Sequence, residues 1–326
     1  MTDHPELTVG IPTVGREYLA ETLQSVETAA TAYDGTVSVV VASAERPRAL
    51  DEVAFDAVQS AEWVETAGST HENRQAILET SGTEWVLFTD DDCRVARDVF
   101  TAYAEGLAAN EDEDLGALYG RVKFVGERSP VFDAGRALAS VPFDAASHEQ
   151  TVEWAPTANA LLSRSAALSV GGFDTENPIP FSGGDVDIGL RLTEGGYTGH
   201  TCPNAVVEHT TATWDSLGTN TRRFFRYGQS EAWLANKYPG QRIPKIGADE
   251  TTPGPFRMSL AYLGSCVSGG EDGTTNPTLL TTVLVILLAV VFTVTNSVGY
   301  HYQVLASVNL PNRLLFHRFR PEGRYL

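Results

Sequence analysis

The feature that most restricts the fold of this chain is an alternation of short apolar runs with helical patterns over its first 110 residues. The run Val37–Ala42 is apolar and β-branched almost throughout, which is typical of a strand buried on both faces. The segment Glu17–Thr31 instead places apolar residues at helical spacing. Strands that alternate with helices form parallel β-α-β units, so the sequence predicts an α/β sheet with helices on both faces.

The loops that follow the expected strands are the expected place for a ligand, because α/β sheets bind ligands beyond the carboxyl ends of their strands. These loops are Thr13–Arg16, Ala42–Arg48 and Asp90–Arg94. After about residue 116 the pattern is less regular, and this half is expected to complete the same sheet. Further strands are expected at Leu7–Pro12, Trp63–Val64, Trp85–Thr89, Leu118–Val125, Ala160–Leu162 and Val206–Val207, and further helices at His71–Thr80 and Asp98–Asn110.

The charge balance excludes one class of partner. The chain has 42 acidic residues against 23 Lys and Arg, a net charge of −19, and 42% hydrophobic residues. A packed core is therefore expected, but not a basic face for nucleic acid, since phosphate binding needs clustered Lys and Arg. Only three of the bases are lysines. This composition resembles that of salt-adapted haloarchaeal proteins; an acidic mesophilic protein is the alternative.

The charges are unevenly placed, and the gap predicts a membrane segment. No Asp, Glu, Lys or Arg occurs between Asp272 and Arg313, and Thr278–Thr295 within it is strongly apolar. About 20 apolar residues span a bilayer, although a buried core helix is the alternative. A single span would place the Arg-rich tail outside, against the positive-inside tendency, so a second pass or interfacial docking stays open. The expected organisation is a catalytic domain over 1–250, a linker over 251–277, a membrane-spanning or membrane-docking segment over 278–300 and a basic tail over 301–326.

The cysteines and the first residues indicate a protein that faces the cytoplasm. Cys93, Cys202 and Cys266 are widely spaced and form no CxxC pair, so neither a zinc knuckle nor a disulfide framework is expected. The acidic start of the chain has no apolar signal-peptide core.

The strongest chemical signal is the run Asp90-Asp91-Asp92 at the end of an apolar strand. Adjacent carboxylates there repel one another and lose hydration, which costs free energy unless a cation or several donors compensate. Alternation along an extended chain would put Asp90 and Asp92 on one side, where they suit Mg²⁺ or Mn²⁺. An acidic turn on an acidic surface is the alternative.

A second signal is Gly183-Gly184-Asp185, which follows the Gly171–Asp174 turn. Residues after Asp185 continue with helical spacing, so its carboxylate is expected at a helix N-terminus, held ionised and oriented. Such a carboxylate beside a substrate can serve as a general base; a simple helix cap is the alternative.

Taken together, these motifs resemble a family 2 glycosyltransferase of the GT-A fold over roughly residues 6–235. The pieces that carry the resemblance are Val9–Arg16, Glu72-Asn73-Arg74 followed by Gly82, Asp90-Asp91-Asp92, Gly171–Asp174, Gly184–Asp187 with Arg191, His209 after Val206-Val207, and Arg222–Ser230.

The resemblance implies an inverting transfer from a nucleotide-diphosphate sugar. Asp90 and Asp92 would hold Mg²⁺ or Mn²⁺ on the diphosphate, with His209 a further candidate ligand, and Asp185 would be the catalytic base. Support of the acceptor or of the active-site loop is assigned to Asp187, Arg191 and Trp154. Donor binding is assigned to Pro12, Thr13, Arg16, Ser43, Asn73, Asp90 and Asp91.

Some positions depart from the family pattern. Ala42-Ser43-Ala44 stands where Asp residues usually follow the second strand, Glu72 where Arg is common, and Gly15 where Asn is common. A uridine donor is therefore an expectation from the family alone. The cluster Arg222–Arg226 fits a phosphate of donor or lipid carrier, or the polar side of a helix at a membrane surface.

With the C-terminal apolar segment and the composition, the resemblance extends to haloarchaeal enzymes that build dolichol phosphate-linked glycans for S-layer N-glycosylation, with a hexuronic acid as one candidate sugar. The expected partners are a UDP-sugar, a lipid-linked glycan and the cell membrane, with the catalytic domain in the cytoplasm. Two other functions stay open: a sugar nucleotidyltransferase, and a non-catalytic membrane-bound partner with a degenerate donor site.

Overall fold

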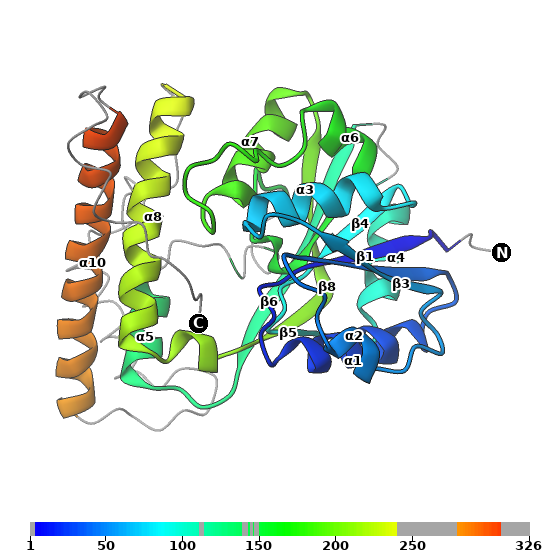
Figure 1. Cartoon of the computed structure of the whole chain (residues 1–326), viewed down its shortest axis with the longest axis horizontal. Coiled ribbons are helices and arrows are strands. Elements are labelled where there is room, and N and C mark those ends of the chain that lie inside the picture. Colours follow the sequence, from blue (N-terminus) through cyan, green and yellow to red (C-terminus); the bar gives the residue numbers. More distant parts are fainter. Residues whose placement is uncertain are drawn as a thin grey trace. The chain divides into compact units, whose positions relative to one another are not determined.

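The computed structural model describes residues 4–110, 114–138, 143, 146, 150–239 and 279–307. The chain divides into two compact units (Figure 1). Unit 1 comprises residues 1–126 and 141–211, and unit 2 comprises residues 127–140 and 212–326. The expected linker over 251–277 and the last 19 residues of the expected basic tail, 308–326, lie outside the described residues.

Unit 1 is built on one eight-stranded mixed sheet with the strand order β3-β2-β1-β4-β7-β6-β8-β5. The first four strands are parallel, as the βαβ pattern predicts, and β2 is buried along nearly its whole length because both of its faces are covered. In the second half, β7 runs antiparallel to β4 and β6, whereas β6 and β8 are parallel and β5 is antiparallel to β8. The strands are β1 (Leu7–Pro12), β2 (Val37–Ser43), β3 (Ser60–Glu65), β4 (Trp85–Phe88), β5 (Cys93–Val95), β6 (Leu115–Val125), β7 (Ala160–Ser163) and β8 (Thr198–Thr210).

Helices cover both faces of this sheet, which confirms the predicted α/β class (Figure 1). One face packs against α3 (Thr70–Thr80), α6 (Arg164–Ser169) and α7 (Gly184–Glu194) through buried aliphatic side chains such as Ile77 and Ile188. The other face packs against α1 (Leu19–Ala30) and α4 (Val99–Ala109), and α2 (Ala49–Glu52) packs on α1.

The helix that precedes the acidic strand is fixed at its start by its own sequence. The Ser69 side chain accepts from the Glu72 amide, and the Glu72 side chain accepts from the Ser69 amide, so both form a capping box. This cap determines where α3 begins, and α3 carries Asn73 and Arg74 toward the carboxyl ends of β1 and β4.

The described part of unit 2 contains three helices that share an apolar core. These are α5 (Pro130–Leu138), α8 (Leu217–Lys237) and α10 (Leu279–Ser307), with a 3-10 turn at Ala212–Trp214. Phe224 of α8 stacks on Phe292 of α10 with ring centroids 4.9 Å apart. A Cβ on Gly228 would lie 1.9 Å from the Asn296 carbonyl oxygen, so glycine is required where the two helices touch.

The apolar C-terminal segment forms the long helix α10, which continues to Ser307 beyond the expected end at residue 300. Its inward face is buried in the core of unit 2, whereas its other face exposes aliphatic side chains. Within the described residues, Val283–Ser307 is the one helix long and apolar enough to cross a membrane. The exposed side chains include Val283, Leu284, Leu287, Val290, Val291, Val294, Val298 and Leu305.

Candidate active site

The three adjacent aspartates lie in a tight turn between β4 and β5. The Cys93 amide donates to the Asp90 carbonyl over 3.2 Å, which closes the turn. Asp90 and Asp92 are therefore brought together by the turn, and not by the alternation of an extended strand that the sequence indicates. The middle residue, Asp91, is directed elsewhere.

Asp91 binds the loop that follows β1. Its carboxylate accepts from the Thr13 hydroxyl at 2.5 Å and from the Arg16 guanidinium at 3.2 Å, and it is buried. Burial raises the pKa of Asp91 to about 6, and the neighbouring Asp92 adds to this, while Arg16 and Thr13 oppose it. Arg16 also contacts Asp92 at 3.0 Å, so one half-exposed guanidinium serves two buried carboxylates.

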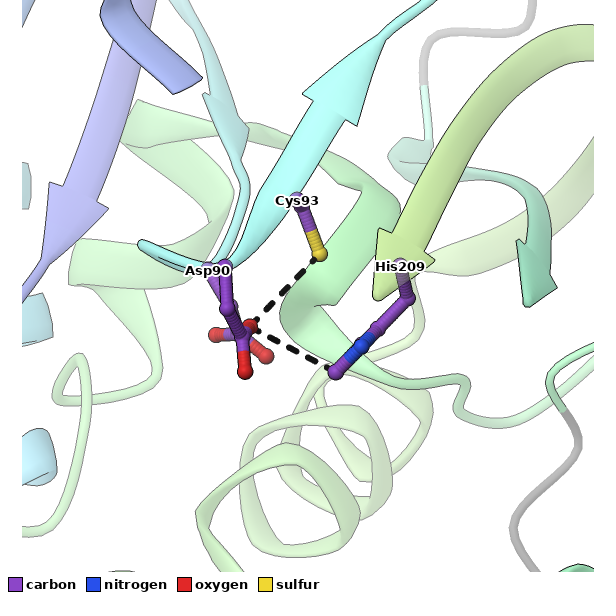
Figure 2. A group of neighbouring side chains, drawn as sticks. Asp90, Cys93 and His209 are labelled. Atoms are coloured by element: carbon purple, nitrogen blue, oxygen red, sulfur yellow. Dashed lines mark hydrogen bonds and ion pairs between the residues drawn. The ribbon is translucent and has the colours of Figure 1, made fainter. Parts of the chain in front are cut away.

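Asp90, Asp92, Cys93 and His209 form a group whose candidate ligand atoms all lie within 4.8 Å of one another. The Nε2 atom of His209 is 3.5 Å from Asp92 Oδ1, and the Cys93 sulfur is 4.0 Å from the same oxygen. Figure 2 shows the Cys93 and His209 side chains directed at the carboxylates of the turn. All of these residues belong to unit 1.

The hydrogen bond of His209 determines which of its ring nitrogens faces the acidic turn. Its Nδ1 atom is 3.0 Å from the Thr210 carbonyl, which can only accept, so Nδ1 carries the hydrogen. In the neutral ring Nε2 is then a bare acceptor that faces the Asp92 carboxylate, also an acceptor. Nε2 and the carboxylate oxygens thus offer lone pairs within a few ångströms of one another, so the residues fit a divalent metal ion.

Asp185 lies in the first turn of α7, as the sequence predicts. The helix starts after Gly183, whose φ of 82° lies in the left-handed region that favours glycine. The Val186 amide donates to Asp185 Oδ1 at 3.0 Å. Burial raises the pKa of Asp185, and the positive charge of Arg74 counteracts this. The net effect is a pKa above the usual value of an aspartate.

Arg74 contacts the acidic turn and acts electrostatically on Asp185, and the site residues predicted from the sequence do not include it. Its guanidinium donates to Asp90 Oδ1 at 3.3 Å, and its charge also acts on Asp185. The Arg74 side chain is 11% exposed, so its charge is poorly screened by water. Its position one residue after Asn73 on a helix leading to the acidic strand is the signal that could have identified it.

The residues assigned to support lie on α7 or pack against it. Asp187 is fully buried and accepts from Arg191 at 3.1 and 2.6 Å, while Arg191 also donates to the Val170 carbonyl at 2.7 Å. This pair attaches α7 to the end of α6. Trp154 packs on the same helix, since a Cβ on Gly189 would lie 2.5 Å from the Trp154 Cβ. Their role in acceptor or loop support stays a prediction.

The residues assigned to donor binding meet at the ends of β1 and β2. Pro12 ends β1 beside Ala42, and Asn73 donates to the Thr13 carbonyl at 3.3 Å. Asn73 also accepts from Thr66, whose amide donates to the Ser43 carbonyl at 3.1 Å. The Ser43 hydroxyl donates to the Glu45 carbonyl and accepts from the Trp63 indole N–H, so it is engaged in hydrogen bonds within the protein.

The basic cluster of the sequence lies on α8 in unit 2. Arg223 stacks over the Trp214 ring at 3.8 Å, donates to the Thr213 carbonyl at 3.2 Å and contacts Asn220. These contacts fix the start of α8, which gives Arg223 a structural role within this unit.

Comparison with known proteins agrees with this arrangement. A family model described as Glycosyl transferase family group 2 matches residues 85–296, more than half of the chain. No protein with a curated description matches the sequence.

Two solved structures are similar over most of this chain. The mannosyltransferase PcManGT from Pyrobaculum calidifontis, in complex with GDP-Man and Mn²⁺, has a TM-score of 0.52 and 20% identity, covering 94% of this chain and 86% of that one. S. aureus TarS has a TM-score of 0.50 and 13% identity, covering 91% of this chain and 55% of that one. At these identities the likeness concerns the fold alone, and it confirms the predicted GT-A type. The chain, with its acidic turn at the end of the fourth strand of this fold, belongs to glycosyl transferase family group 2.

Proposed function

We propose that this protein is an inverting glycosyltransferase that moves a sugar from a nucleotide-diphosphate donor to a hydroxyl of a lipid-linked glycan. The observation that carries the proposal is the group of Asp90, Asp92 and His209, together with Arg74, which contacts Asp90 and whose charge acts on Asp185. Asp90, Asp92 and His209 would hold Mg²⁺ or Mn²⁺, which supplies positive charge for the departing diphosphate.

Asp185 is the proposed general base. One carboxylate oxygen accepts from the Val186 amide, and the other is assigned the proton of the acceptor hydroxyl. Burial raises its pKa, and a carboxylate with a raised pKa is a more effective base than one at its ordinary value. Asp187 and Arg191 would hold the helix that carries it. The sugar, with a hexuronic acid as one candidate, and its nucleotide stay predictions.

The test uses purified full-length protein with a panel of UDP- and GDP-sugars, Mn²⁺ and a polyprenyl phosphate-linked glycan in molar salt. A donor is expected to give lipid-linked product. Asp185→Asn should lower turnover by about 10²–10⁴-fold while donor binding by calorimetry persists. Asp92→Ala should weaken Mn²⁺-dependent donor binding itself. Asp34→Asn, at a 91% exposed surface carboxylate, is the matched control and should behave like the wild type.

The outcomes separate the functions left open by the sequence. Transfer that survives both Asp185→Asn and Asp92→Ala would remove this mechanism. Release of pyrophosphate from a nucleoside triphosphate and a sugar phosphate would indicate the nucleotidyltransferase instead. Donor binding without transfer to any acceptor would favour the non-catalytic partner.

We further propose that the membrane is the site of action and that α10 docks on it without crossing it. The exposed face from Val283 to Leu305 is about 33 Å long at 1.5 Å per residue and consists mainly of aliphatic side chains. The residues after it carry Arg313, Arg318 and Arg320, which suit anionic headgroups. The proposal includes a lipid-linked acceptor of the dolichol phosphate type in a haloarchaeal N-glycosylation pathway. It places unit 1 in the cytoplasm.

Docking is favoured over spanning because α8 covers the opposite face of α10. Asn296 of α10 donates to Glu231 of α8 at 3.2 Å, and α8 also carries the exposed Arg222. A spanning α10 would take these charges to bilayer depth, at a cost of about 3 kcal/mol for each. If α10 inserts only its outward face into one leaflet, the charged side chains stay in water and this free-energy cost does not arise.

A depth profile tests the docking. Nitroxide labels at Val283, Val294 and Leu305, in a Cys266→Ser background, should report one shallow depth in anionic vesicles. A spanning helix would place Val294 far deeper than the two ends. Protein that fails to float with vesicles would refute membrane docking, whereas the transferase assay above stands separately.

A further inference from the structure

Cys93 occupies a position in the metal-binding group that its sequence context does not indicate. It follows the acidic turn directly and begins β5, which pairs with β8 in antiparallel register. In that register Cys93 lies opposite His209. Residues directly opposite on antiparallel strands project from the same face, so the sulfur and the imidazole point the same way (Figure 2).

The donor atoms have a spacing that one ion can bridge. The sulfur is 4.0 Å from Asp92 Oδ1, and the four candidate donor atoms lie within 4.8 Å of one another. Two donors of a tetrahedral ion, with bonds of roughly 2.1 and 2.3 Å, are about 3.6 Å apart. Side-chain movements of about 1 Å would therefore bring all four donors onto one metal ion.

The chemistry of the four donors is mixed. Asp90 and Asp92 offer hard oxygens that suit Mg²⁺ and Mn²⁺, whereas Cys93 and His209 offer sulfur and nitrogen that suit Zn²⁺ and Co²⁺. Zn²⁺ with four protein ligands has a complete tetrahedral shell, as in structural zinc sites. Mn²⁺ bound by the oxygens and the imidazole keeps open positions for a diphosphate.

We propose that Cys93 is a metal ligand and that it lets this site bind Zn²⁺ in a closed, four-coordinate form. Zn²⁺ bound in this way leaves no position for the diphosphate, so it inhibits the enzyme, which is active with Mn²⁺ or Mg²⁺. As the sulfur–metal bond forms, the thiol proton passes to solvent. This inference rests on the metal site of the proposed function, but it concerns the choice of metal and not the transfer reaction.

The experiment follows Co²⁺ added to the metal-free full-length protein, because a sulfur ligand produces an intense near-ultraviolet charge-transfer band. The wild type should show the band. Cys93→Ser should lose it while the visible cobalt bands from the other ligands remain. Cys202→Ser is the matched control, since Cys202 is also a buried thiol of unit 1 but is not in the metal-binding group, and it should keep the band.

Competition with Zn²⁺ and Mn²⁺ completes the test. Cys93→Ser should weaken Zn²⁺ binding by at least about tenfold and Mn²⁺ binding by less than about threefold. Wild-type protein that binds Mn²⁺, by loss of the free-ion paramagnetic resonance signal, yet shows no charge-transfer band would overturn the role of Cys93 alone. Protein that binds no Mn²⁺ would overturn the metal site itself and the proposed function with it.

Discussion

Replacing Asp91 by asparagine is expected to stabilise the metal-free protein at neutral pH. The reason lies in the direction of its pKa shift: burial raises the pKa of this carboxyl from 3.8 to about 6. The folded state therefore holds the proton more tightly than the unfolded state does. The contribution of Asp91 to stability is fully present below pH 3.8 and is lost as pH rises through about 6.

The size of the effect follows from the shift. Two pKa units correspond to about 3 kcal/mol, and the side chain is almost fully buried, so solvent does not screen it. Asparagine never ionises and keeps an oxygen for the Thr13 hydroxyl. The shift already includes the attraction between Asp91 and Arg16, so that contact is not subtracted again. The net gain above pH 7 is thus about 3 kcal/mol.

The measurement is urea unfolding from pH 4 to 8 in EDTA at constant salt, with hydrogen exchange of the β1 and β4 peptides as a local readout for unit 1. The wild type should lose stability across pH 4–6, and Asp91→Asn should lose less. Asp34→Asn is the surface control. An Asp91→Asn protein that is less stable than the wild type at pH 7.5, with the same pH dependence, would refute the reasoning.

Three further predictions concern single contacts. Arg74→Gln removes the charge that lowers the pKa of Asp185, so the base ionises at higher pH and the acid limb of the kcat/KM profile should move upward. Arg191→Met removes the positive charge that pairs with the buried Asp187 and should lower the free energy of unfolding by about 3 kcal/mol in urea. Gly228→Val places a side chain where α10 backbone lies within 2 Å and should speed hydrogen exchange in α10, unlike Gly218→Val at an open position of the same helix.

The first half of the sheet could be predicted from the sequence because its strands are continuous apolar runs. Val37–Ala42 and Trp85–Thr89 are such runs, and they became β2 and β4 with small changes at their ends. The sequence predicts β8 only at Val206-Val207, because the earlier residues of this strand mix polar and apolar types and include Pro203. The three residues of β5 form a strand only by pairing with β8, more than a hundred residues away.

The same limit applies to the site. The position of Asp90 and Asp92 at the end of a strand could be predicted because they follow an apolar run. The position of Asp185 in the first turn of a helix could be predicted because glycines precede it and a helical pattern follows it. Cys93 could not be found in this way, since its nearness to His209 exists only in the register of β5 on β8. Local patterns identify a residue at the end of an element, but not the neighbour that a distant strand supplies.

The three aspartates of the turn differ in the groups that they contact. Asp91 is bound by Thr13 and Arg16 and so fixes the loop after β1, while Asp90 contacts Arg74 and Asp92 faces His209. Arg16 also contacts Asp92, so two arginines compensate the three adjacent carboxylates at one strand end. Because Arg74 serves Asp90 and also acts on Asp185, the electrostatics of the metal-binding group and of the proposed base depend on the same side chain.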